Sequence, residues 1–255
     1  MNDPTPIDPT ALLQGLAGTY LRNPRRTTGA CAACCGGVNP EYMLCYPCEA
    51  FRQQGRLSNA AGFCIYAAQG TQAGQLMYGY KAPYPAREHV VVMSLLLQLA
   101  LNNHAQCPSR LVGQRVTHWA AVPSTRGRIA PHPLRGMVAA IRPEPEVVLT
   151  HVEGVQPVRQ RVVPGLFRSG ASLADGSHVL LVDDTWASGG TPLSAVHALR
   201  EAGASWVSII AVARWLSFDF MRAPTSGPTL DLHRSLLSQV VYDLSACPFT
   251  GSVCP

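Results

Sequence analysis

The sequence has few charged residues and almost no lysine. Charged residues make up 14% of the 255 positions, and Lys81 is the only lysine, so arginine carries nearly all of the positive charge. The net charge of +5 is mild. An excess of this size suits an anionic small molecule or a weak contact with nucleic acid, and by itself it indicates neither. Hydrophobic residues make up 47%, which excludes a disordered composition.

The sequence also lacks an apolar run long enough to cross a membrane. The longest such stretch, Val90–Leu101, is interrupted by Ser94 and Gln98 and falls short of the ~20 residues that a span needs. No basic cluster followed by an apolar run opens the chain, so no signal peptide is expected. We therefore expect a cytoplasmic protein without membrane contact. Disulfides are rare in that compartment, and the nine cysteines need another role.

Two Cys-x-x-Cys pairs lie close together in the first fifth of the sequence. Cys31 and Cys34 form the first pair, Cys45 and Cys48 the second, and ten residues separate them. Four thiolates at this spacing can form a tetrahedral Zn²⁺ site, and a segment this short would gain much of its folding energy from the metal. We predict a structural zinc module. The alternative is that these cysteines pack as small apolar side chains.

Less is expected of the other five cysteines. Cys35 adjoins the first pair and could replace Cys34 as a ligand. Cys64 and Cys107 are interpreted as buried or incidental thiols. Cys247 and Cys254 could pair with each other or reach the metal, but the sequence assigns them no specific role. None of the cysteines has an activating context, so no catalytic cysteine is predicted.

Strands and helices alternate along most of the chain. We expect an opening helix at about 9–20, followed by the cysteine segment. The later elements are expected as two strands around a glycine-containing turn over 63–81, a helix over 85–104, a strand over 116–123, a helix over 132–141, a short strand over 146–152, strands over 178–182 and 206–216, and helices over 192–202 and 230–239. This alternation predicts an α/β fold with a parallel sheet and helical crossovers.

The chain divides into three parts by composition. Residues 1–24 are expected to form a helix and a linker, residues 25–60 a zinc-ribbon-like module, and residues 61–255 the main α/β domain.

The stretch from His178 to Ala204 carries the clearest functional pattern. Four apolar residues precede Asp183 and Asp184, and a Ser-Gly-Gly-Thr turn leads into an amphipathic helix. In open parallel sheets, ligands bind beyond the carboxyl ends of the strands. Small residues let backbone N–H groups approach an anion, and the helix N-terminus adds roughly half a positive charge. Carboxylates accept hydrogen bonds from neighbouring sugar hydroxyls. The pattern therefore predicts a site for a 5-phosphorylated ribose.

Residues 179–191, VLLVDDTWASGGT, resemble the phosphoribosyl pyrophosphate (PRPP) signature of type I phosphoribosyltransferases, with Ser188 at the first threonine of the signature. An acidic pocket like that of response regulators, or a plain strand-to-helix turn, is the alternative. A cysteine ribbon ahead of such a domain resembles the ComF family, which is linked to competence and DNA uptake in bacteria. The segments around Lys81 and Pro123, and the one ending at Gly165 and Phe167, also resemble that family. Its common Arg-Gly-Phe-Asn-Gln run is replaced here by LRGMVAA.

The resemblance implies a type I phosphoribosyltransferase-like parallel sheet flanked by helices. It assigns a catalytic role to Asp183 and Asp184, which would hold the ribose, and to Arg126 as the charge partner of pyrophosphate. Arg159 and Arg161 would lie in a loop that can close over the pyrophosphate. The full set implied to bind PRPP is Asp183, Asp184, Thr185, Ala187, Ser188, Gly189, Gly190, Thr191, Pro123, Ser124, Arg126 and Arg128.

The resulting hypothesis is a Mg²⁺-dependent phosphoribosyltransferase. It would transfer phosphoribose from PRPP to an unidentified nitrogen nucleophile and release pyrophosphate, with Zn²⁺ in a structural role. The alternative is a non-catalytic ComF-like protein of DNA uptake, whose partners would be single-stranded DNA or a competence helicase. A third hypothesis is a regulatory domain that only senses PRPP.

Overall fold

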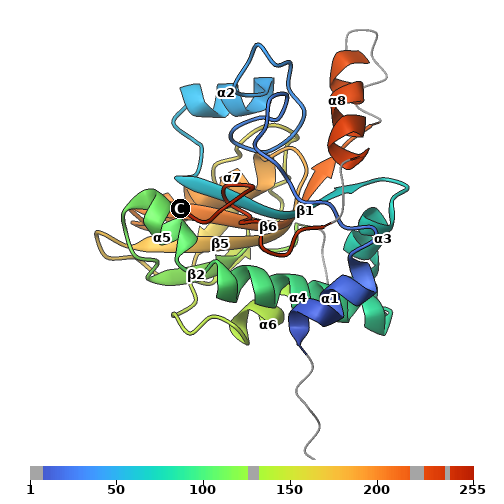
Figure 1. The fold of residues 1–255 in the computed structure, drawn as a ribbon. Coiled ribbons are helices and arrows are strands. Elements are labelled where there is room, and N and C mark those ends of the chain that lie inside the picture. Colours follow the sequence, from blue (N-terminus) through green and yellow to red (C-terminus); the bar gives the residue numbers. More distant parts are fainter. Residues whose placement is uncertain (1–7, 126–131, 219–226, 239–241) are drawn as a thin grey trace, which may run out of the picture.

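A four-stranded parallel sheet forms the centre of the molecule (Figure 1). The computed structural model describes residues 8–125, 132–218, 227–238 and 242–255. The strands of the sheet lie in the order β1 (Ala60–Ala68), β6 (Trp206–Leu216), β5 (His178–Trp186) and β2 (His118–Ala121). Apolar side chains cover both faces of the two central strands, as a parallel sheet packed between helices requires. The predicted fold class is therefore confirmed.

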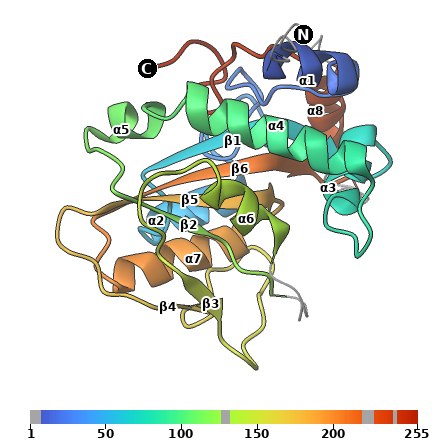
Figure 2. The ribbon, with the colours of Figure 1, turned by 90° about the horizontal axis from the view of Figure 1, so that it is seen from below.

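Helices cover both faces of this sheet (Figures 1 and 2). On one face α1, α3, α4 and α6 enclose a core, and on the other α2 and α7 enclose a second core together with the cysteine segment. The bounds are α1 Pro9–Ala17, α2 Tyr46–Gln53, α3 Gln72–Gly79, α4 Arg87–Asn103, α5 Cys107–Val112, α6 Pro133–Ala139, α7 Gly190–Glu201 and α8 Gly227–Ser238. No helix within the described residues is long and apolar enough to cross a membrane.

The strand expected to end at Val182 continues through the acid pair. β5 pairs with β6 as far as Trp186, which lies opposite Arg214. Asp183 and Asp184 are therefore held in the extended backbone of a central strand rather than in a loop, and α7 begins at Gly190, two residues earlier than expected. The acid pair is therefore held more rigidly than in a loop, because Val182 before it and Thr185 after it both pair with β6.

The prediction of a second strand within residues 63–81 is wrong, because the helix α3 forms there instead. The Thr71 side chain caps this helix by accepting a hydrogen bond from the Gly74 backbone N–H at 3.0 Å. Gly74 also permits a tight strand-to-helix packing, because a Cβ there would lie 2.0 Å from the Ala68 carbonyl oxygen. The glycines that suggested a hairpin turn thus allow a helix to pack against β1.

The short strand expected over 146–152 does not join the parallel sheet as one element. Its central part, β3 (Leu149–His151), pairs antiparallel with β4 (Phe167–Ser169) in a separate two-stranded sheet. Only the preceding residues run beside β2, where Val147 donates its N–H to the Trp119 carbonyl at 2.8 Å. A three-residue strand has too few apolar positions for its sequence to specify which neighbour it pairs with.

Candidate functional site

The acid pair lies in a pocket of about 350 Å³ beside the carboxyl ends of β2 and β5. The loop after β2 and the start of α7 meet the acids there, as expected for a parallel sheet. Seven of the residues implied to bind PRPP line this pocket: Pro123, Ser124, Asp183, Asp184, Thr185, Ala187 and Thr191. Two segments separated by about 60 residues in sequence are thus brought to one cavity.

Three donors converge on a single oxygen of Asp184. Its Oδ2 accepts hydrogen bonds from the Tyr80 hydroxyl at 2.7 Å and from Lys81 Nζ at 2.8 Å, and His132 Nε2 lies 3.2 Å away. His132 Nδ1 accepts a hydrogen bond from the Leu134 backbone N–H at the start of α6, so its proton resides on Nε2 and faces the carboxylate. The α3–α4 connection and the start of α6 are therefore both tied to β5.

The two neighbouring acids differ in electrostatic character. Burial and the adjacent charge of Asp184 raise the pKa of Asp183 to about 8. Burial would also raise the pKa of Asp184, but the hydrogen bond from His132 and the charge of Lys81 outweigh it and hold this pKa below its ordinary range. Asp184 is thus a fixed anion. Asp183, which accepts the Asp184 backbone N–H at 2.8 Å, is the carboxyl that a cation or a ligand hydroxyl can still influence.

The turn between β5 and α7 is tightly packed on its outer side. Gly189 adopts a φ of +84°, which favours glycine, and a Cβ there would lie 2.8 Å from the Trp186 ring. A Cβ on Gly190 would lie 2.6 Å from the Arg161 carbonyl oxygen. Ser188 accepts the Gln160 backbone N–H at 3.4 Å and lines a neighbouring pocket. The small residues of the turn therefore also allow the backbone of residues 158–161 to pack on it.

The arginines implied to bind pyrophosphate fall in different places. Arg126 and Arg128 lie outside the described residues. Arg159 and Arg161 are exposed, and Arg159 lines the neighbouring pocket beside the cysteine segment rather than the pocket of the acid pair. Neither Arg159 nor Arg161 lines the pocket of the acid pair.

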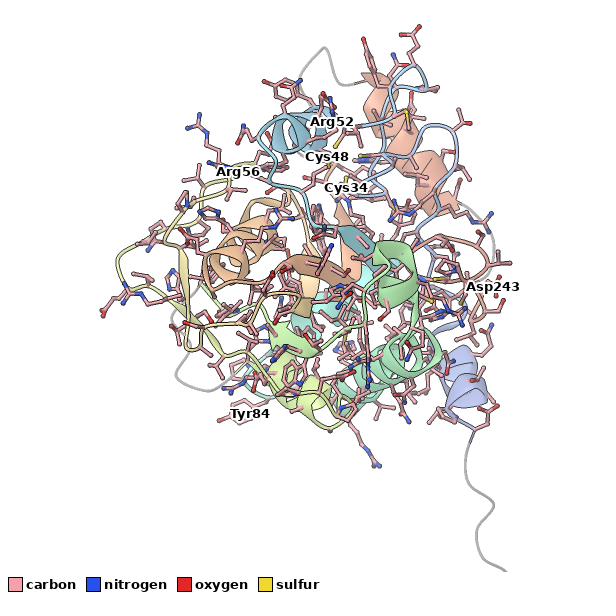
Figure 3. The ribbon with its side chains drawn as sticks, turned by 90° about the vertical axis from the view of Figure 1, so that its left-hand side faces the viewer. Cys34, Cys48, Arg52, Arg56, Tyr84 and Asp243 are labelled. Atoms are coloured by element: carbon pink, nitrogen blue, oxygen red, sulfur yellow. The ribbon has the colours of Figure 1, made fainter. Side chains whose placement is uncertain are left out.

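The four predicted zinc ligands come together. The sulfurs of Cys31, Cys34, Cys45 and Cys48 all lie within 4.8 Å of one another, and those of Cys34 and Cys45 are 3.7 Å apart. A tetrahedral Zn²⁺ with bonds of about 2.3 Å places its sulfurs roughly 3.8 Å apart, so the donor set fits zinc. Figure 3 shows Cys34 and Cys48 close together beside α2. Cys35, which has a φ of 55°, is not part of the group.

A buried arginine connects this cysteine cluster with the turn of the site. Arg214, on β6, donates from Nε to the Cys34 carbonyl at 2.6 Å and from Nη1 to the Ala187 carbonyl at 3.1 Å. Its Nη2 lies 3.5 Å from the Cys34 sulfur. The guanidinium reaches these partners through the space left by Gly36, where a Cβ would lie 2.2 Å from Nη2. The cysteine module and the start of the turn thus share one rigid contact.

Sequence reasoning missed several residues that shape the pocket. Tyr80 lies within the segment around Lys81 that carries a family resemblance, but the resemblance assigns it no role. Tyr78 and Trp215 line the pocket and meet edge to face, with ring centroids 5.5 Å apart. Sequence spacing offers no signal for this pair, because the two rings come from α3 and β6 and meet only in the fold.

Comparison with known proteins finds a family match over part of the chain. Residues 133–217 match the family described as "Phosphoribosyl transferase domain". No curated protein matches the sequence. The matched stretch includes the acid pair, the turn and α7, which are the elements that carry the PRPP-signature resemblance.

Several solved phosphoribosyltransferase structures are similar to the chain. Adenine phosphoribosyltransferase from Trypanosoma brucei, solved with AMP, pyrophosphate and ribose-5-phosphate, is 17% identical, with 77% of this chain and 84% of that chain covered and a TM-score of 0.36. A purine phosphoribosyltransferase from Pyrococcus horikoshii is 17% identical, covering 52% and 90%, with a TM-score of 0.32. A phosphoribosyltransferase from Corynebacterium diphtheriae is 19% identical, covering 61% and 88%, with a TM-score of 0.32.

Proposed function

We propose that this protein transfers the 5-phosphoribosyl group of PRPP to a nitrogen nucleophile and releases pyrophosphate. The observation that carries the proposal is the pocket at the end of β5. There an acid pair, the first turn of α7 and the loop after β2 surround one cavity, and the acid pair and α7 lie within the residues that match the phosphoribosyl transferase domain. We propose a nucleobase as the first nitrogen nucleophile to test.

Different groups in the pocket would bind the phosphate, the ribose and the pyrophosphate of PRPP. Backbone N–H groups of residues 187–191 and the N-terminus of α7 would hold the 5-phosphate, since both favour an anion. Asp183 would accept hydrogen bonds from ribose hydroxyls, while Asp184 keeps Lys81 and His132 in the pocket wall. Pro123 and Ser124 would meet the pyrophosphate end, and the family resemblance assigns Arg126 and Arg128 to the same end of the ligand. Such positioning, together with stabilisation of the departing charge, is the main source of rate in this reaction class.

The pocket also fits a magnesium ion. Asp183 offers a hard carboxylate ligand, and because burial and the charge of Asp184 raise its pKa, a nearby cation would favour its charged form. We propose that Asp183 would hold a Mg²⁺ that accompanies PRPP, and that the bound ion would supply positive charge for the departing pyrophosphate. In the same way, we propose that Cys31, Cys34, Cys45 and Cys48 hold a structural Zn²⁺, because four protein ligands leave no open position for chemistry.

Three of the four arginines in the cysteine segment, residues 25–60, are engaged within the protein. Arg26 donates to the Ala61 and Phe249 carbonyls, Arg52 pairs with Glu49, and Arg56 donates to the Val162 carbonyl. Figure 3 places Arg52 and Arg56 apart from each other beside α2. Guanidinium groups already bonded in this way are less available to neutralise phosphates, so the placement of charge does not favour the DNA-binding alternative.

The proposal is tested by following pyrophosphate release from PRPP and Mg²⁺ with ammonia and with purine and pyrimidine bases. We expect release that depends on the nucleophile, and a loss in kcat/KM of about 100-fold or more for Asp183→Asn. Glu201→Gln, on the distant end of α7, is the matched control and keeps wild-type rates. The transferase proposal fails if the folded wild type releases no pyrophosphate, or if Asp183→Asn releases it as fast as the wild type.

A further inference from the structure

A second group of potential metal ligands lies across the sheet from the first group. Cys107 and Cys247 belong to the core on one face, and Cys31, Cys34 and Cys48 belong to the core on the other. His104 follows α4 as its C-cap, Cys107 begins α5, and Cys247 and Cys254 lie in the segment 242–255. Their ligand atoms all lie within 4.8 Å of one another. We name these four residues the His-Cys₃ cluster. About 140 residues separate its two halves in sequence, so the fold alone brings them together.

The distances inside the cluster match those between the ligands of one metal ion. His104 Nδ1 lies 3.2 Å from the Cys254 sulfur and 3.8 Å from the Cys107 sulfur. Around a tetrahedral Zn²⁺, with bonds of about 2.0 Å to nitrogen and about 2.3 Å to sulfur, ligand atoms lie roughly 3.5–3.8 Å apart. A movement of a few tenths of an ångström would therefore seat an ion among the four groups.

The surroundings of the cluster favour bound thiolates over incidental thiols. Cys107, Cys247 and His104 are buried, and Cys254 alone is exposed. Backbone N–H groups of Phe249 and Thr250 face the Cys247 sulfur, as in the knuckles that present cysteine to a metal. The intervening turn is fixed, since Cys247 donates its N–H to the Ser252 carbonyl at 2.7 Å and accepts from Gly251 at 2.8 Å.

We propose that His104, Cys107, Cys247 and Cys254 bind a second structural zinc ion. One imidazole and three thiolates form a donor set that zinc prefers among the common metals, and four protein ligands close its coordination. This proposal is independent of the proposed transferase activity. A disulfide between two of the cysteines is the competing arrangement, and it would leave the imidazole of His104 without a role.

The second ion would fasten the segment 242–255 to the main domain. In both Figure 1 and Figure 2 the end of this segment lies beside α5, and Arg110 donates to the Pro255 carbonyl at 2.9 Å. Further back, the Pro248 carbonyl accepts the Phe63 N–H at 3.0 Å, and the Phe249 ring lies where a Cβ on Gly62 would be 3.0 Å from it. The segment therefore supports the edge strand β1, and a metal clip would keep it in place.

The test is zinc content per chain of the purified full-length protein, measured by elemental mass spectrometry. We expect about two zinc ions in the wild type, and about one in each of two double variants, Cys45→Ser/Cys48→Ser and Cys247→Ser/Cys254→Ser. Cys64→Ala is the matched control, because Cys64 is buried in the same core as Cys107 and Cys247 but belongs to neither cluster. It keeps the wild-type content.

The single variant Cys254→Ser separates the loss of a metal ligand from the loss of the fold. Cys254 is exposed, so Cys254→Ser leaves the core intact while removing one ligand. With Co²⁺ in place of zinc, we expect this variant to lose the visible absorption of a site with three sulfurs and one nitrogen and to keep that of the four-sulfur site. The proposal is overturned if Cys254→Ser and the Cys247→Ser/Cys254→Ser variant hold as much metal as the wild type. It is equally overturned if intact-mass measurement finds Cys107, Cys247 or Cys254 in a disulfide.

Discussion

At the scale of single residues, the site depends on how one carboxylate is kept charged inside the protein. Asp184 is 8% exposed, yet three donors from two other segments meet at one of its oxygens. A buried charge is tolerated only when its partners offset the lost hydration, so Tyr80, Lys81 and His132 are as necessary as the acid itself. The sequence offers the acid plainly. Its partners become visible only when the fold is known.

Replacing the partner of this acid tests the electrostatic account. We expect Lys81→Met to lower the free energy of unfolding by about 2 to 3 kcal/mol, because it leaves the Asp184 charge without its cation. Tyr80→Phe removes one hydrogen bond to a charged group and is expected to cost about 1 to 2 kcal/mol. Urea denaturation of both variants measures the difference. A Lys81→Met protein as stable as the wild type would show that the Lys81–Asp184 ion pair does not stabilise the fold.

A buried histidine gives the protein a dependence on pH. His178 is fully buried, with Nδ1 donating to the Gln114 carbonyl at 2.7 Å and Nε2 accepting from the Ser208 hydroxyl at 2.8 Å. Burial lowers its pKa below the ordinary 6.5, although the Gln114 hydrogen bond opposes this. Below that ordinary value the unfolded chain binds a proton that the folded protein does not, so stability is full above about pH 6.5 and falls as the pH drops.

The measurement compares the pH dependence of unfolding in the wild type and in His178→Asn. Other groups titrate in both proteins, so the difference isolates this residue. We expect the variant to lose less stability than the wild type between about pH 7 and 5. Equal slopes in the two proteins would mean that His178 titrates in the folded state as it does in the unfolded chain.

At the scale of elements, the long periodic segments were predictable and the short ones were not. The continuous apolar runs of β5 and β6 and the apolar spacing of α4 and α7 specify their structure locally, and each was predicted within a few residues. The segment of α3 was misassigned because its glycines resemble a turn. Its state is decided by the Thr71 cap and by close packing on β1. The three-residue β3 depends on a partner that its own sequence does not specify.

The candidate site divides in the same way. The acid pair and the turn before α7 are contiguous, so a sequence motif carries them. The His-Cys₃ cluster is split between residues about 140 positions apart, with no regular spacing between its halves. The sequence therefore indicates an incidental thiol at Cys107 and assigns no specific role to Cys247, although the fold places them together.

One glycine tests the connection between the cysteine module and the sheet. We expect Gly36→Ala to lower the free energy of unfolding by about 1 to 3 kcal/mol, since its Cβ would meet the Arg214 guanidinium at 2.2 Å. Gly136→Ala is the matched control. It lies within α6 with nothing near its Cβ position, and is expected to gain about 0.5 to 1 kcal/mol. Equal effects of the two changes in denaturant unfolding would rule out the steric account.

At the scale of the whole molecule, two clusters of cysteine ligands lie at separate places in the described fold. The Cys31–Cys48 group belongs to the core that contains α7, and Cys107 and Cys247 belong to the core that contains α4. Arg26 connects the two regions, because it donates to the Ala61 carbonyl at 2.5 Å and to the Phe249 carbonyl at 2.7 Å. Metal at both positions would therefore support the sheet from both faces.

Removing the metal tests this role of the clusters. A strong zinc chelator is expected to lower the Tm of the wild type by roughly 5 °C or more, because folding and metal binding are coupled. In the Cys45→Ser/Cys48→Ser variant the chelator has less metal to remove, so we expect a smaller shift from an already lower Tm. Thermal unfolding followed by circular dichroism measures both shifts. A wild-type Tm unchanged by chelation would contradict a structural role for zinc.

The central claim is that the pocket at the end of β5 binds PRPP, and calorimetric titration tests it most directly. Zinc-loaded wild type is titrated with PRPP and Mg²⁺, beside Asp183→Asn/Asp184→Asn and the control Glu201→Gln, each first shown to be folded. We predict saturable binding to the wild type and to Glu201→Gln, and its loss in the double variant. Absence of binding to the wild type, or equal binding to the double variant, would contradict the account.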